Sequence, residues 1–185
     1  MPRTPHLFTR LWPSAAATAC LSLVTALGAT SAAASCAGED FAPCTPAPAF
    51  IEAVTTLCLL PADTLSAFDT ALQESGLPQI NEIESSMLRV LSYRTEALML
   101  TVTGLSDDTA ECTVSTGAEV GEGIFAEADT ALQATGATVT ETGQTWDGRP
   151  QITYESAGES LTLTLPEPPF DGMTDITLIR NLPFK

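Results

Sequence analysis

An eight-residue segment occurs twice in the chain, sixty residues apart, and this repetition constrains the possible folds more than any other feature. Residues 69–76 read DTALQESG and residues 129–136 read DTALQATG, so six of the eight positions match. Each copy ends a predicted amphipathic helix whose apolar residues recur at helical spacing. These residues are Leu65, Phe68 and Leu72 in the first copy and Phe125, Ala128 and Leu132 in the second. Gly76 and Gly136 are placed to take the left-handed conformation that ends a helix.

Four strand-like segments follow each of these two glycines. They are 79–84, 87–94, 97–103 and 111–116 in the first copy and 138–143, 150–155, 160–165 and 175–180 in the second. The clearest is 161–165, where leucine and threonine alternate as in a half-buried antiparallel strand. We therefore expect an α+β fold, with one helix packed on its own roughly four-stranded antiparallel sheet in each of two units, 49–117 and 118–185. The alternative is a single irregular α+β domain in which the helix match is coincidental.

The first 34 residues have the pattern of a signal peptide. Arg3 and Arg10 precede an uncharged stretch rich in Ala, Leu, Val and Thr, which ends in a small-x-small cleavage pattern at residues 32–34. We expect cleavage near Ala34 and a periplasmic or secreted product. An uncleaved membrane anchor and a lipoprotein attached through Cys36 are the two alternatives. Residues 35–48, with three prolines, are predicted to form an extended N-terminal arm.

Four cysteines follow the predicted cleavage site, at Cys36, Cys44, Cys58 and Cys112. An even number suits disulfide formation in an oxidising compartment, and lipidation of Cys36 would leave one of the others unpaired. Three connectivities are possible. We favour Cys36–Cys44 and Cys58–Cys112, because this choice keeps both bridges within the arm and the first unit.

The composition excludes several functions. The formal net charge is −16, which repels nucleic acid and anionic membrane surfaces. The only histidine, His6, lies in the predicted signal peptide, and the only lysine is the last residue, Lys185. Histidine-based nucleophile systems, histidine metal sites and lysine nucleophiles are therefore not expected. We predict no cofactor and no metal site, and a protein or small molecule as the partner; the oligomeric state is left open.

Carboxylates are the remaining candidates for catalysis. Asp69 and Asp129 occupy the same place in the two copies, and their positions on the helices predict solvated polar faces. Weak calcium binding by Asp107, Asp108 and Glu111, or by Asp171 and Asp175, is a further possibility, although neither group follows the EF-hand pattern. A carboxylate-based hydrolase, with or without calcium, is the alternative function, and it requires two acids of raised pKa in one pocket.

Trp146 is the only tryptophan after the predicted signal peptide and lies beside an expected Asp147–Gly148 turn, close to Arg149. An exposed tryptophan next to an arginine is typical of a recognition site. The alternative is that the indole folds back onto the edge of the sheet. The sequence thus predicts a non-enzymatic, exported binding or interaction module of the bacterial cell envelope, with Trp146 and Arg149 as its candidate contact residues.

Overall fold

The computed structural model describes residues 43–118, 120, 123–165 and 173–184. The predicted signal peptide, Cys36 and Asp171 lie outside these residues. Within the described part of the chain, no helix combines the length and the apolar character that a membrane crossing requires.

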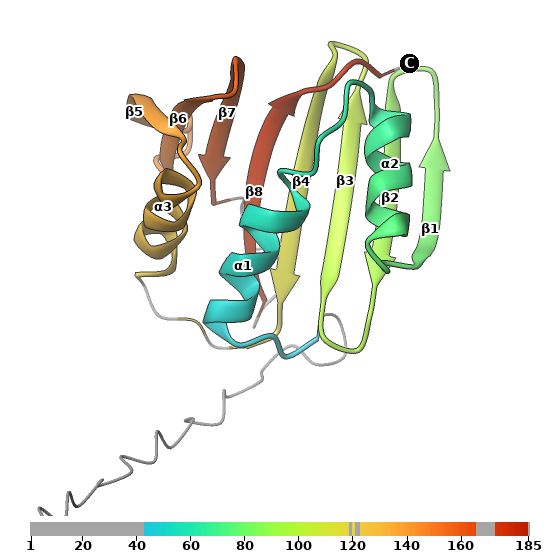
Figure 1. Ribbon diagram of the computed structural model, residues 1–185, viewed down its shortest axis with the longest axis horizontal. Coiled ribbons are helices and arrows are strands. Elements are labelled where there is room, and N and C mark those ends of the chain that lie inside the picture. The colour runs from blue at the N-terminus through green and yellow to red at the C-terminus, as the bar shows by residue number, and fades with distance from the viewer. Residues whose placement is uncertain (1–42, 119, 121–122, 166–172, 185) are drawn as a thin grey trace, which may run out of the picture. The chain divides into compact units, whose positions relative to one another are not determined.

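The described residues form three helices and eight strands (Figure 1). The helices are α1 (Ala47–Leu57), α2 (Leu65–Glu74) and α3 (Ile124–Ala134). The strands are β1 (Gln79–Glu84), β2 (Leu88–Arg94), β3 (Met99–Leu105), β4 (Thr109–Thr116), β5 (Thr138–Gln144), β6 (Pro150–Ser156), β7 (Glu159–Thr164) and β8 (Thr174–Asn181). The class is α+β, as expected, and every predicted strand is present with ends within two residues of the prediction.

Helix ends follow local rules. The Thr64 side chain caps the start of α2, because its Oγ1 accepts a hydrogen bond of 3.1 Å from the N–H of Ala67. Beyond the last turns of α2 and α3, Gly76 and Gly136 have φ angles of +88° and +98°. Both glycines therefore take the left-handed conformation that the sequence predicts.

The strands form one continuous antiparallel sheet in the order β1-β2-β3-β4-β8-β7-β6-β5. The expectation of two separate sheets of about four strands is therefore wrong. β4 and β8, the last strands of the two predicted units, pair along their whole lengths, from Thr109 opposite Asn181 to Thr116 opposite Thr174. Two separate sheets would each have left a partly buried strand with unpaired backbone groups at an edge, and the β4–β8 ladder pairs these groups.

The three helices cover one face of the sheet (Figure 1), and α1 contacts β4 and β8 at its centre. The main core lies between these layers, where residues of β2, β3, β4, β7 and β8 alternate with residues of the opposite face. Gly104 of β3 makes room for the fully buried Leu65 of α2, since a Cβ atom at Gly104 would lie 2.3 Å from a Leu65 methyl carbon. Helix packing and strand sequence are thus matched at this point.

A disulfide joins Cys58, at the end of α1, to Cys112 in β4, as the sequence predicts. Both cysteines are buried, with a Cα–Cα distance of 5.6 Å. The bridge therefore fixes α1 over the central strands. Cys44 is also disulfide-bonded; its predicted partner, Cys36, lies outside the described residues.

Candidate functional site

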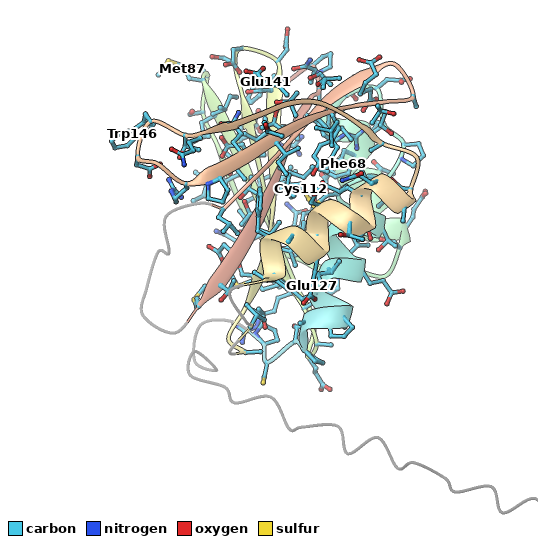
Figure 2. The ribbon with its side chains drawn as sticks, turned by 90° about the vertical axis from the view of Figure 1, so that its left-hand side faces the viewer. Phe68, Met87, Cys112, Glu127, Glu141 and Trp146 are labelled. Atoms are coloured by element: carbon cyan, nitrogen blue, oxygen red, sulfur yellow. A yellow bond between two sulfur atoms is a disulfide. The ribbon has the colours of Figure 1, made fainter. Side chains whose placement is uncertain are left out.

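Trp146 lies at the tip of the β5–β6 hairpin and is almost completely exposed, at 96% of its possible surface. The loop is short: Thr145 N donates to Arg149 O at 2.9 Å, and Gly148 N donates to Thr145 O at 2.9 Å. Gly148 has a φ of +85°, which a three-residue hairpin loop of this kind requires at its last position. Figure 2 shows Trp146 projecting from the hairpin, away from the helices. The alternative in which the indole folds back onto the sheet edge is wrong.

Arg149 holds this turn in place. Its Nε donates to Asp147 Oδ2 at 2.7 Å, and its Nη1 donates to the carbonyl oxygen of Leu165 at 2.6 Å. The Arg149 guanidinium, with a further hydrogen bond from Thr145, lowers the pKa of Asp147 to about 2. The loop that carries Trp146 is therefore braced by charged hydrogen bonds on both strands of the hairpin and beyond them. Arg149, predicted from the sequence as a contact residue, has a positioning role in the same turn.

A second large apolar side chain is exposed in the corresponding turn of the first half. Met87 lies between β1 and β2 and exposes 70% of its surface. β1 and β5 are the two ends of the sheet, so the turns with Met87 and Trp146 belong to opposite edges. Trp146 presents the larger and more exposed apolar surface of the two.

No protein-family model, curated protein or solved structure matches this chain.

The face of the sheet opposite the helices carries a row of hydroxyl side chains. The row crosses five neighbouring strands, because each residue is the register partner of the next: Ser92, Thr101, Thr113, Thr177 and Thr164. At its centre, the hydroxyl oxygens of Thr113 and Thr177 lie 2.7 Å apart in a hydrogen bond. The alternating threonines in the sequence indicate a polar face on individual strands. They do not indicate that strands of the two halves pair, which is what makes the row continuous.

Two half-buried carboxylates flank this hydroxyl row, Glu111 on β4 and Asp175 on β8. Burial raises the pKa of both, and the negative charge of Asp107 adds to the effect at Glu111. Asp175 is the register partner of Ser115, four residues along β4 from Glu111. At a rise of about 3.3 Å per residue the two positions are about 13 Å apart. These two acids therefore do not form the close pair that the hydrolase alternative requires.

Asp69 differs from the expected solvated helix acid, because only 9% of its surface is exposed. Its Oδ1 accepts hydrogen bonds of 2.7 Å from the hydroxyl of Tyr93 and from Nε2 of Gln73, and Arg89 forms an ion pair with Oδ2 at 3.3 Å. These contacts lock α2 onto β2. Two signals in the sequence pointed to them: the Asp–Gln spacing of four residues within the helix, and a tyrosine 24 residues after Asp69 and 25 residues after Asp129.

Asp129 makes two corresponding contacts in the second half. It accepts hydrogen bonds from the Tyr154 hydroxyl at 2.8 Å and from Gln133 Nε2 at 2.7 Å. Desolvation and the neighbouring aspartate raise the pKa of each tyrosine, Tyr93 and Tyr154. An arginine partner like that of Asp69 is missing, since no described arginine pairs with Asp129. Both aspartates therefore serve the attachment of a helix to the sheet.

Arg180 is the buried cation of the core. Its Nη1 donates to the carbonyl oxygens of Cys58 and Leu60 at 3.1 and 2.8 Å, and its Nη2 pairs with Glu159 at 2.9 Å. The guanidinium carbon also lies 5.4 Å from the ring centroid of Phe68. These contacts hold the α1–α2 connection against β8. Arg180 and Glu159 border a surface cavity of about 300 Å³.

Two of the calcium candidates, Asp107 and Asp108, already accept hydrogen bonds within the protein. Asp107 accepts hydrogen bonds from the backbone and hydroxyl of Thr109, and Asp108 accepts one of 3.1 Å from the N–H of Phe184. Within the described ranges, no three acidic, cysteine or histidine side chains converge as metal ligands would. Asp171 lies outside those ranges.

Proposed function

We propose that the protein is a non-enzymatic binding module, exported to the bacterial cell envelope, that recognises a partner through the Trp146 hairpin. One observation carries the proposal: an almost completely exposed tryptophan stands on a turn that is braced by an ion pair and by backbone hydrogen bonds. An exposed indole in water gains nothing for the stability of the fold. The exposed indole is therefore free to contribute its whole surface to a contact.

The rigidity of the turn favours binding. A partner that orders a mobile loop loses part of the binding energy to conformational entropy, whereas a braced turn has already met that cost. A tryptophan side chain offers about 250 Å² of surface, so its burial is worth about 6 kcal/mol at 25 cal/mol per Å². Measured losses on truncating such anchors are smaller, typically about 2–4 kcal/mol. Trp146 can therefore dominate an interface of modest size.

The partner is expected to be a protein or a small ligand without strong negative charge. The chain carries 23 acidic residues against seven basic ones. Of the basic residues that the structure describes, Arg89, Arg149 and Arg180 are each in an ion pair. Such a surface disfavours nucleic acid and anionic lipid.

We also propose that the two halves are copies of one helix-plus-sheet unit. The proposal is supported by contacts and irregularities that both halves share, although a helix packed on a sheet does not require them. The Asp–Tyr and Asp–Gln hydrogen bonds occur in both halves, and a bulge interrupts β1 at Ile80 and β5 at Thr140, directly after corresponding residues. The unit joins its copy edge to edge, which gives a single sheet with a similar hairpin at each end.

The registers support the same proposal. In each half, a tyrosine is the register partner of a leucine on the next strand. The residue two positions beyond this leucine is in turn the register partner of a residue on a neighbouring strand. The tyrosine, the leucine and this last partner are Tyr93, Leu100 and Cys112 in the first half and Tyr154, Leu161 and Leu178 in the second. Cys112 and Leu178 are partners of each other in the β4–β8 ladder. A two-fold rotation about this pair therefore exchanges the registers of the two halves.

Export and signal-peptide cleavage near Ala34 remain part of the proposal. The Cys58–Cys112 disulfide supports an oxidising compartment. The mass of the purified product would identify its N-terminus, any lipid on Cys36 and the number of bridges. A lipid on Cys36 would replace the secreted form by a lipoprotein.

A comparison of three baits tests the binding proposal. Wild-type protein, Trp146→Ala and Met87→Ala are immobilised and exposed to envelope extract, and the affinity for each retained protein is then measured with purified components. Loss of 2 kcal/mol or more predicts binding about 30-fold weaker for Trp146→Ala. Met87→Ala is the matched control, since it removes an exposed apolar side chain from the corresponding turn. Equal affinity for all three would exclude Trp146 as the contact site, and substrate turnover lost in Asp175→Asn would favour the hydrolase alternative.

A further inference from the structure

β1 forms one end of the sheet and pairs with β2 alone among the described strands. Ser85 N donates to Leu88 O at 2.8 Å where the two strands meet at their hairpin. Hydrogen-bonded pairs in an antiparallel ladder recur at every second residue, so the backbone of Ile83 bonds to β2. The N–H and C=O groups of Glu82 and Glu84 consequently point away from the sheet. This edge offers unpaired donors and acceptors to another strand.

The side chains of β1 divide into an apolar side and an acidic side. Ile83 exposes 56% of its surface and is the register partner of Val90, on the face opposite the helices. Glu82 and Glu84 lie on the helix-bearing side, where Glu82 forms an ion pair with Arg89 at 2.8 Å. Glu84 is exposed and forms no ion pair with a described residue. A strand added beside β1 would meet an isoleucine on one side and carboxylates on the other.

The opposite edge of the sheet provides a contrast. Thr145 N donates to Arg149 O, so the backbone groups of Thr142 in β5 point outward by the same rule. β5 has one partly exposed apolar residue, Val139 at 36%, and a single glutamate. A bulge in each edge strand leaves a straight edge from residue 81 to residue 84 on β1 and from residue 141 to residue 144 on β5. The two edges are thus equally short, but the β1 edge is amphipathic and acidic, and the β5 edge is mostly polar.

We propose that β1 accepts an extended peptide segment of a partner protein in which basic and apolar residues alternate over about four to six positions. The basic residues face Glu82 and Glu84, and the apolar residues continue the row formed by Ile83 and Val90. Backbone hydrogen bonds between the antiparallel strand edges supply the affinity, and the apolar and acidic side chains on the two sides of β1 supply the selectivity. A second copy of the chain is disfavoured, because its own glutamates would meet these glutamates and both chains are strongly acidic. This surface is distinct from the Trp146 turn, at the other end of the sheet.

Two synthetic six-residue peptides of identical composition test the proposal. One alternates lysine and valine; the other places three lysines before three valines, so that general attraction to an acidic protein is the same for both. Binding is measured by fluorescence anisotropy at two salt concentrations, together with sedimentation of the unliganded protein. The variants are Glu84→Pro, which removes an outward N–H without touching the β1–β2 ladder, Glu84→Lys, which reverses the charge, and the matched control Thr142→Pro on β5.

The alternating peptide is expected to bind at least about tenfold more tightly than the block peptide, and to lose about tenfold in affinity on Glu84→Pro, as expected for loss of one backbone hydrogen bond and the contacts beside it. Glu84→Lys should weaken binding similarly, and Thr142→Pro and Trp146→Ala should leave it unchanged. Equal binding of the two peptides, or equal effects of the two proline variants, would overturn the proposal. A wild-type dimer that Glu84→Pro dissociates would assign the edge to a second copy instead. Failure here leaves the Trp146 proposal intact, since the two sites have separate variants.

Discussion

The Cys58–Cys112 disulfide gives the most quantitative prediction about the fold. The bridge spans 54 residues between the end of α1 and β4. In the chain-entropy model, closing a loop of this length destabilises the unfolded chain by about 4 kcal/mol. Domains of this size have about 5–15 kcal/mol of stability in total. Replacing both cysteines in Cys58→Ala/Cys112→Ala should therefore remove a large share of the free energy of unfolding.

Urea unfolding measures this loss. With a slope of about 2 kcal/mol per molar urea, a loss of 4 kcal/mol moves the unfolding midpoint down by about 2 M. Both sulfur atoms are buried, so the alanine variant also loses some packing. The downward shift of its unfolding midpoint should therefore be no smaller than this estimate. Mild reduction of the wild type is a less selective comparison, because Cys44 is disulfide-bonded as well.

The double variant Cys36→Ala/Cys44→Ala, which removes the bridge predicted between these two cysteines, is the matched control for the loss of a bridge. A loop of about eight residues is worth about 2.5 kcal/mol in the same model, so this variant should shift the midpoint less. An unfolding midpoint of Cys58→Ala/Cys112→Ala within a few tenths of a molar of wild type would refute the reasoning. Such a result would mean that the helix and the central strands remain associated in the unfolded state, or that the bridge adds nothing to their packing.

Three further changes have defined outcomes. Tyr93→Phe should cost about 1.5–3 kcal/mol of unfolding free energy, since a charged hydrogen bond to a buried aspartate is lost, and Tyr154→Phe about half of that because its aspartate is more exposed; urea titrations compare the two. Asp175 has a raised pKa in the folded state, so its contribution favours folding below about pH 4 and is lost as the pH rises through the folded pKa. Melting curves should therefore show that Asp175→Asn is more stable than wild type at pH 7 but not at pH 3. Gly104→Ala should cost about 1–3 kcal/mol through overlap with Leu65 and clearly less in a Leu65→Ala background, as a double-mutant cycle would show.

The sequence was most informative where structure is local. The positions of all eight strands and the left-handed glycines Gly76 and Gly136 follow from spacing and turn residues, whereas cysteine counting left three connectivities, of which the favoured Cys58–Cys112 pair is present. The pairing of β4 with β8 does not follow, because an alternating strand has the same pattern whether its free edge meets solvent or a strand sixty residues away. Local periodicity fixes the face of a side chain, and only the global arrangement fixes its neighbour.

The candidate site shows the same division. Trp146 and the Asp147–Gly148 turn were identified from the sequence, but exposure of the indole was not, because a tryptophan beside a turn can also pack on a sheet edge. Arg149 was predicted at the contact surface, and the sequence did not reveal that it braces the turn through Asp147 and Leu165. Asp69 was expected in solvent, and its burial depends on Tyr93 arriving from another element, which helical periodicity cannot reveal.

The central claim is that Trp146 contacts the partner, and the hydration of its indole in the bound state tests this claim most directly. Trp146 becomes the only tryptophan of the full chain in a Trp12→Phe variant, and labelling with 5-fluorotryptophan then gives a single fluorine resonance. The free protein should show a resonance that shifts with the solvent isotope, as expected for a hydrated indole. Addition of the purified partner should move this resonance and abolish the isotope shift. A bound complex in which the resonance and its isotope shift stay unchanged would contradict the account.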